Sequence, residues 1–109
     1  MKTKYLIAGI LLSASNSVLS APYTTFGGTD CGKWMTVTTS ARQAWLLGFL
    51  SGLAFLHARK DFKPVNPLDS VSSAEQMFVW MDNYCKTNPL GNVTEGAVEL
   101  FDEIVDRKR

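Results

Sequence analysis

Two cysteines, Cys31 and Cys85, and a single histidine, His57, are the residues of this chain best suited to metal or nucleophile chemistry. Zinc sites space their ligands a few residues apart in pairs, and these three residues are too widely separated for that pattern. No Ser, Asp or Glu lies in a recognisable nucleophile motif. Two cysteines in an exported chain instead indicate a disulfide, because that compartment is oxidising. We expect a Cys31–Cys85 disulfide and no catalytic residue, metal site or cofactor.

The first 20 residues have the pattern of a secretory signal peptide. Lys2 and Lys4 precede an apolar stretch at 5–12, and small or polar residues dominate from there to Ser20. This order is typical of a cleaved signal, and the stretch is shorter than the roughly 20 apolar residues of a membrane span. We expect cleavage after Ser20, a mature chain of residues 21–109 in the periplasm, and no stable membrane anchor after cleavage.

The mature chain is short and nearly neutral. Removal of Lys2 and Lys4 changes the formal net charge from +1 to about −1, whereas a nucleic-acid-binding domain needs a basic patch to neutralise phosphates. A chain of this length forms one domain, and such small domains often depend on a covalent cross-link. We therefore predict a single disulfide-stapled domain that binds no nucleic acid.

Three segments predict helices, and each begins with a capping signal. They cover 41–58, 73–86 and 93–107. Ser40 with Gln43 and Ser72 with Glu75 fit the capping box, and Asn92 is a third candidate cap. Proline and glycine lie between the segments, where they interrupt helices. The fold class predicted is all-α, with three to four helices.

The helix predicted at 41–58 contains WLLGFLSGLAFL and is apolar on nearly every side, which predicts a central, buried helix. Its small residues gather on one side, where they would let another helix approach closely. Gly48 and Gly52 have the spacing at which membrane helices pair, but the apolar run is too short to span a bilayer. We expect close packing at these two glycines, either within one chain or across a homodimer.

The helix predicted at 73–86 places its apolar residues and Cys85 on one face. That face comprises Ala74, Met77, Phe78, Met81, Tyr84 and Cys85. The cysteine therefore points inward from the last turn. A bond to Cys31 would pin this end of the helix to the segment before the first helix.

The helix predicted at 93–107 is the most amphipathic. Its core stripe comprises Val93, Ala97, Leu100, Phe101, Ile104 and Val105. Glu95, Glu99, Asp102, Glu103 and Asp106 share the opposite face at 100° per residue. This face is either a solvated surface, a binding face for a basic partner, or a surface whose charge responds to pH.

The segment ARKDFKPVNPLDSV, at 58–71, is the best candidate for a loop that binds a partner. It offers Phe62 among the charged residues Arg59, Lys60, Asp61 and Lys63. An apolar anchor within a polar rim is typical of a binding hot spot. The alternative is a plain linker between two helices.

The order of these features resembles two groups of small periplasmic proteins. GFLSG at 48–52 and YCKTNP at 84–89 are most similar to Tai/Rap-type immunity proteins of type VI secretion, which bind and block a toxic effector. The layout is also similar to that of the Hde acid-stress chaperones, which are all-helical and held by one disulfide. The resemblance implies a steric inhibitor of an effector or, alternatively, a chaperone whose fold opens in acid. A plasmid or phage exclusion factor is a weaker alternative, and an enzyme comes last.

Overall fold

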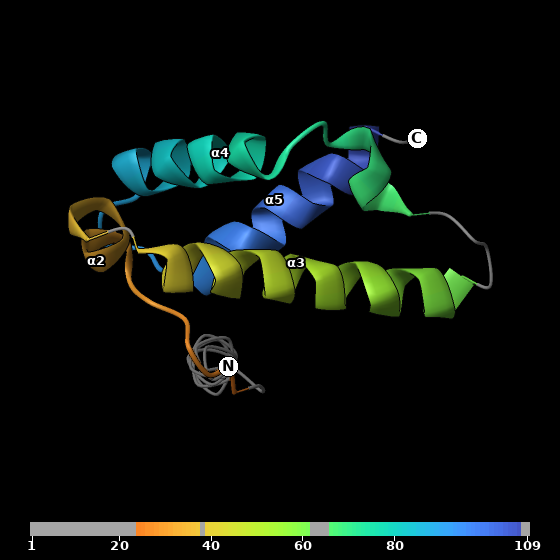
Figure 1. The fold of residues 1–109 in the computed structure, drawn as a ribbon, viewed down its shortest axis with the longest axis horizontal. Coiled ribbons are helices and arrows are strands. Elements are labelled where there is room, and N and C mark those ends of the chain that lie inside the picture. Colours follow the sequence, from red (N-terminus) through yellow and green to blue (C-terminus); the bar gives the residue numbers. More distant parts are fainter. Residues whose placement is uncertain (1–23, 38, 62–65, 108–109) are drawn as a thin grey trace, which may run out of the picture.

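The computed structural model describes residues 24–37, 39–61 and 66–107 of the chain. The described part is helical apart from short connections and one isolated β-bridge (Figure 1). Its elements are α2 (Cys31–Thr36), α3 (Ser40–Asp61), the 3-10 helix η2 (Pro67–Ser70), α4 (Ala74–Thr87) and α5 (Val93–Arg107). The predicted all-α class is confirmed. The predicted signal peptide lies outside the described residues.

The three predicted helices correspond to α3, α4 and α5. The bounds of α5 agree with the prediction, those of α4 differ by one residue at each end, and α3 continues to Asp61. The short helix α2 was not predicted, because six residues are too few to show a helical period. A local signal for it was present in Asp30, whose Oδ1 accepts a hydrogen bond from the Lys33 N–H at 2.8 Å.

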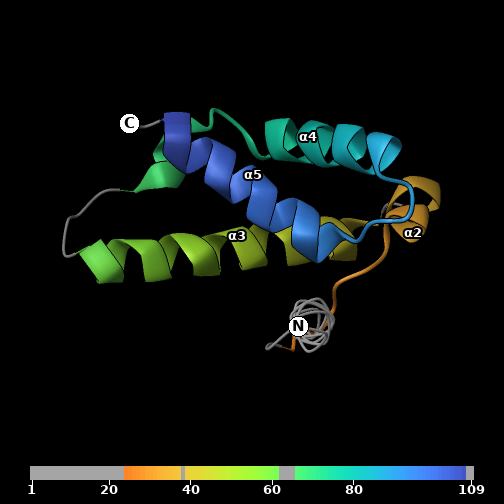
Figure 2. The ribbon, with the colours of Figure 1, turned by 180° about the vertical axis from the view of Figure 1, so that it is seen from behind.

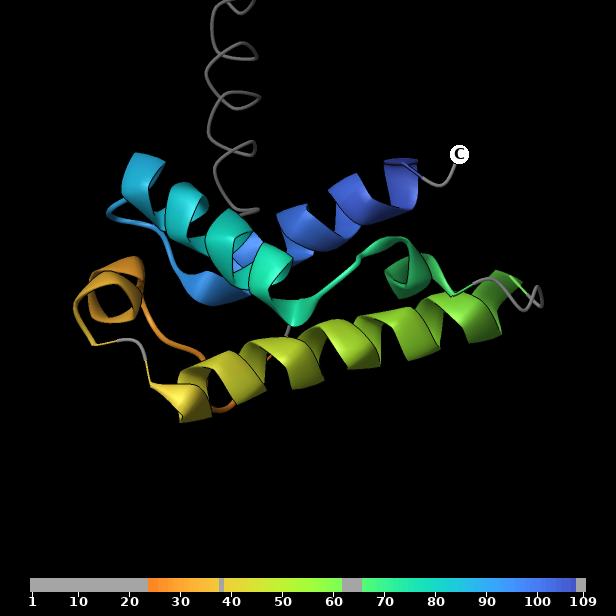
Figure 3. The ribbon, with the colours of Figure 1, turned by 45° about the horizontal axis from the view of Figure 1, so that its top comes forward.

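The helix at the centre of the molecule is α5. Figures 1 and 2 show α5 running diagonally between α3 and α4, and it contacts α3, α4 and η2. Figure 3 shows α2 at the end where α3 begins and α4 finishes. Of the buried core, α5 supplies Val93, Ala97, Leu100, Phe101 and Ile104. Its predicted core stripe is thereby confirmed, with Val105 half-buried at the edge.

The prediction that the first long helix is central and buried is wrong. In α3, Leu46 and Leu50 are fully buried, but Phe55 and Leu56 are 60% and 62% exposed. Only one side of α3 has another described helix against it, because α4 and α5 lie on the same side (Figure 3). An apolar composition on all sides therefore did not indicate which side would be covered.

Gly48 and Gly52 lie on the exposed side of α3. A Cβ added at either position would meet no described atom within 4 Å outside the helix's own nearby backbone. Close helix packing occurs instead at Gly96 of α5, where an added Cβ would lie 2.7 Å from Tyr84 Cδ1 and 2.9 Å from Met81 Sδ. Packing of Gly48 and Gly52 within the described chain is thus not found, and their pairing across a homodimer stays a prediction.

The disulfide joins α2 to the last turn of α4. Cys31 and Cys85 are bonded with a Cα–Cα distance of 4.9 Å, and each is 1% exposed, which confirms the predicted pairing and the inward direction of Cys85. One turn further along α2, Trp34 is fully buried, and its Nε1 donates to Asp82 Oδ1 at 2.7 Å. A covalent bond and a side-chain hydrogen bond therefore both hold α2 against α4.

The segment before α2 lies against the start of α5 and against α3. An antiparallel bridge pairs Asp30 with Asn92. Near it, Trp45 Nε1 donates to the Phe26 carbonyl oxygen at 2.6 Å. Gly27 has a φ of 84°, and a Cβ there would lie 2.6 Å from Trp45 Cδ1. This position therefore requires glycine both for its left-handed backbone and for the close approach of the indole.

One of the three predicted caps is confirmed. Asn92 Oδ1 accepts a hydrogen bond from the Glu95 N–H at 2.9 Å. The prediction for Ser40 is wrong, because this residue is already helical and the hydroxyl that caps α3 belongs to Thr39, which accepts from the Arg42 N–H at 3.3 Å. The hydroxyl that caps α3 therefore lies one residue before the predicted position.

The predicted cap at Ser72 is also wrong. The cap position of α4 is Ser73, and its side chain makes no capping hydrogen bond. Gln76 reaches back instead of Glu75, and its Oε1 accepts from the Ser72 N–H at 2.9 Å. The bond of Gln76 therefore holds the residue before the cap position, and no serine hydroxyl caps α4.

These caps support a first prediction. Asn92→Ala is expected to lower the free energy of unfolding by about 1 kcal/mol, because it removes the acceptor of an N-terminal N–H. Ser73→Ala is the matched control and should change it by much less, since no cap bond is lost. Urea unfolding of the mature protein measures both. Equal losses for the two variants would contradict the assignment.

Candidate protein-binding surfaces

The C-terminal part of α3 exposes large apolar side chains next to cations. We define the α3 tip as Phe55, Leu56, Arg59 and Lys60. The Arg59 guanidinium carbon lies 5.7 Å from the centroid of the Phe55 ring, and all four side chains are exposed. A cation over an exposed ring contributes roughly 0.5–1 kcal/mol, so Arg59 helps to hold the orientation of the ring.

The predicted binding loop at 58–71 is only partly a loop. Arg59, Lys60 and Asp61 belong to α3, because nothing in their sequence interrupts the helix before Pro64. Further along, η2 occupies Pro67–Ser70, and Pro67 is buried. Phe62 and Lys63 lie outside the described residues, so their role in binding stays a prediction.

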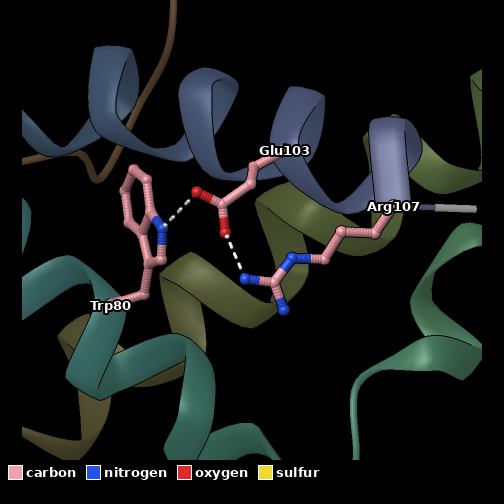
Figure 4. A network of polar contacts seen from close by, with 3 residues as sticks. All are labelled: Trp80, Glu103 and Arg107. Atoms are coloured by element: carbon pink, nitrogen blue, oxygen red, sulfur yellow. Dashed lines mark hydrogen bonds and ion pairs between the residues drawn. The ribbon is translucent and has the colours of Figure 1, made fainter.

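The acidic face of α5 divides into an exposed part and a part directed at α4. Glu95, Glu99 and Asp102 are exposed, as is Asp106. Glu103 is half-buried, and its Oε1 accepts from Trp80 Nε1 at 3.3 Å (Figure 4). Glu103 Oε2 lies 3.2 Å from Arg107 Nη2. The prediction placed all five acids on one face and did not separate Glu103 from the others.

Two stacked aromatic rings of α4 lie beside the acidic residues of α5. The rings of Trp80 and Tyr84 have centroids 5.6 Å apart and are nearly parallel, at 10°. Burial raises the pKa of the Tyr84 hydroxyl, and the negative charges of Glu99 and Glu95 raise it further. Glu95, Glu99 and Glu103 are spaced by four residues, so they follow one edge of α5 beside the ring pair. We call these three residues the acidic edge.

A groove of about 530 Å³ opens between α4, the end of α5 and the segment 70–73. Its apolar lining comprises Val71, Met77, Val79, Trp80, Leu100 and Ile104. Its charged lining residues are Glu75, Glu103 and Arg107. This groove was not predicted from the sequence, because its lining comes from two helices and a connecting segment that meet only in the folded chain.

The sequence also offered a single histidine and possible metal ligands. His57 is half-buried, with its ring edge-on to Phe101 at a centroid distance of 5.9 Å and an angle of 76°. Within the described ranges, no group of three or more His, Cys, Asp or Glu residues is placed to hold a metal ion. None of the helices in the described part has the length and apolar character needed to cross a bilayer.

Comparison of the chain with models of protein families, with curated proteins and with solved structures gives no match. The functional proposal therefore depends on the surfaces of the molecule itself. These are the α3 tip, the acidic edge of α5 and the groove beside Trp80.

Proposed function

We propose that this chain is a small periplasmic protein-binding protein, and that it acts as an immunity-type inhibitor that sterically blocks a toxic effector. The observation that carries the proposal is the α3 tip, where Phe55 and Leu56 stand more than half exposed. Neighbouring apolar side chains that are rimmed by polar groups are typical of protein–protein binding sites. Aromatic anchors within such a rim supply most of the binding energy.

The mechanism is steric and requires no chemical step. The α3 tip extends from a helix whose Leu46 and Leu50 are anchored in the core, so little ordering entropy is lost on binding. The phenyl ring of Phe55 would enter the cleft of the effector and exclude its substrate. Arg59 and Lys60 would favour a cleft lined with carboxylates, because opposite charges steer and orient association.

The first experiment identifies the partner. Tagged mature protein is used to capture proteins from periplasmic extract and from lysates of neighbouring strains, at pH 7 and at pH 3. We expect one stoichiometric partner at pH 7, whose toxicity is abolished when this protein is co-expressed in the periplasm. Many weak clients bound at pH 3 alone would contradict the inhibitor and favour an acid-activated chaperone.

The second experiment tests the surface and is a prediction in its own right. Phe55→Ala combined with Leu56→Ala is expected to weaken binding of the captured partner by roughly 30-fold or more, because a hot-spot residue contributes about 2 kcal/mol or more. The matched control is Leu90→Ala, which removes a fully exposed leucine from the connection between α4 and α5. Isothermal titration calorimetry gives the affinities, and circular dichroism checks the helices.

The control separates a specific surface from a general loss of apolar area. Leu90→Ala should bind the partner as tightly as the wild type does. Unchanged affinity of the Phe55 and Leu56 variant would exclude the α3 tip as the binding surface.

A further inference from the structure

At the acidic end of the groove between α4 and α5, Glu103 forms an ion pair with Arg107 of the same helix. Glu103 and Arg107 are one helical turn apart, and their side chains are 44% and 74% exposed. Exposed pairs of this kind contribute little to stability. An external cation of suitable geometry can therefore replace Arg107 on Glu103 at small cost.

The other bond of Glu103 is the one that orients it. Trp80 Nε1 donates to Oε1 from the neighbouring helix (Figure 4), while Oε2 faces Arg107. If Arg107 moves away, the carboxylate keeps its tryptophan partner and its position. The oxygen that is released is then available to a guanidinium or an ammonium group.

The indole adds a second feature that suits a cation. Trp80 lines the groove, and the Tyr84 ring stacks on one face of the indole. Tryptophan offers the strongest aromatic face for a lysine or arginine head group. The apolar lining beside it, including Met77 and Leu100, suits the methylene stem of such a side chain.

The charges around the groove select the sign of the ligand. Among the described residues that line the groove, the carboxylates Glu75 and Glu103 oppose one cation, Arg107. Glu95 and Glu99 of the acidic edge are exposed and continue the negative charge along α5. Opposite charge on a partner would accelerate and orient its association with this surface.

We infer that the groove between α4 and α5 binds a lysine or arginine side chain presented by a segment of a partner protein, and that this side chain displaces Arg107 from Glu103. A protein segment is favoured over a free amine, because the groove also carries apolar lining that a neighbouring apolar side chain would cover. The inference concerns α4 and α5, so it is independent of the α3 tip and of the inhibitor proposed above.

The test uses a defined probe with the mature protein. The probe is a short acetylated and amidated peptide with a central arginine flanked by leucines, and its control has citrulline in place of arginine. Citrulline has nearly the same shape without the charge. We expect the arginine peptide to bind, with the citrulline peptide and free arginine amide at least tenfold weaker. Absence of binding, or equal binding of all three probes, would overturn the inference.

Two variants with opposite expected effects locate the site. Glu103→Gln should weaken binding of the arginine peptide by roughly tenfold, because hydrogen bonds to charged groups are the stronger ones. Arg107→Gln should tighten it by about twofold, because it removes the competing cation. A variant that only disturbed the fold would not tighten binding. Loss of binding in Arg107→Gln would overturn the inference, because Arg107 would then support binding of the peptide instead of competing with it.

A matched control accounts for net charge. Asp106→Asn removes one negative charge from an exposed residue of the same helix that does not line the groove. It should change the affinity for the arginine peptide by much less than Glu103→Gln does. An equal change would overturn the inference, because it would show that the peptide is attracted only by the net charge of the protein. If circular dichroism shows that Glu103→Gln does not fold, Arg107→Gln and the citrulline peptide still test the inference. The Phe55 and Leu56 variant should bind the probe normally.

Discussion

Reduction of the Cys31–Cys85 disulfide is expected to lower the free energy of unfolding of the mature protein by about 4 kcal/mol. The bond joins two cysteines that are 54 residues apart in the sequence. Closing a loop of this length strongly restricts the unfolded chain in the chain-entropy model. The total stability of a small domain is only about 5–15 kcal/mol. The oxidised protein should therefore be clearly folded and the reduced protein close to unfolding.

The structure adds a local reason for so large an effect. A helix of six residues is not stable by itself, and α2 is held to α4 by this bond and by the packing of Trp34. Loss of the bond should release α2 first.

Urea unfolding with and without reductant, followed by circular dichroism, measures the effect. A variant with Cys31→Ser and Cys85→Ser should match the reduced protein, which controls for the reductant itself. An unchanged unfolding midpoint after complete reduction would show that the cross-link contributes nothing to stability.

Trp34→Ala is expected to lower the free energy of unfolding by about 3–5 kcal/mol, which is the usual cost of truncating a buried tryptophan. Its side chain is the largest among the fully buried ones, so its removal leaves a cavity between α2 and α4. The change also deprives Asp82 Oδ1 of the indole donor at 2.7 Å. A half-buried carboxylate that loses a hydrogen bond adds to the penalty.

Two further variants divide this effect into its parts. Trp34→Phe keeps most of the ring but removes the donor, so it should cost less than the alanine change. Met35→Ala changes the neighbouring residue of the same short helix, which is 43% exposed, and should have only a small effect. If Met35→Ala proved as costly as Trp34→Ala, the loss would come from α2 as a helix and not from the buried indole.

The Trp34 and disulfide effects should not add. Both act on the same contact between α2 and α4, and residues that share a contact usually show coupled energies. Trp34→Ala in the reduced protein is therefore expected to cost less than it does in the oxidised protein.

The functional surfaces could be predicted only in part. The acids of α5 were expected on one face, and Glu95, Glu99 and Asp102 are indeed exposed. Asp106 is exposed as well, but the fifth acid, Glu103, turns toward Trp80, which lies 23 positions away in the sequence. No pattern within one helix could show this pairing, because it depends on how α4 crosses α5. In the α3 tip, Arg59 and Lys60 were placed in a loop, and Phe55 was placed in a helix predicted to be buried. Exposure of Phe55 depends on which side of α3 the other helices cover.

By itself the sequence determined the features that depend on neighbours within one or two turns. These are the approximate extents of α3, α4 and α5, the helical periods of α4 and α5, the Asn92 cap, the core stripe of α5 and the inward face of Cys85. Local backbone geometry decides which residues share a face, so a period of 3.6 residues is sufficient to read them.

Only the tertiary structure decided which faces meet. It made α5 the central helix and left Gly48 and Gly52 uncovered, although α3 has the longer apolar run. It also formed α2, whose six residues depend on Trp34 and on a disulfide to a distant helix. The physical reason is that burial is a property of pairs of elements: an apolar face is covered only where another helix is held against it.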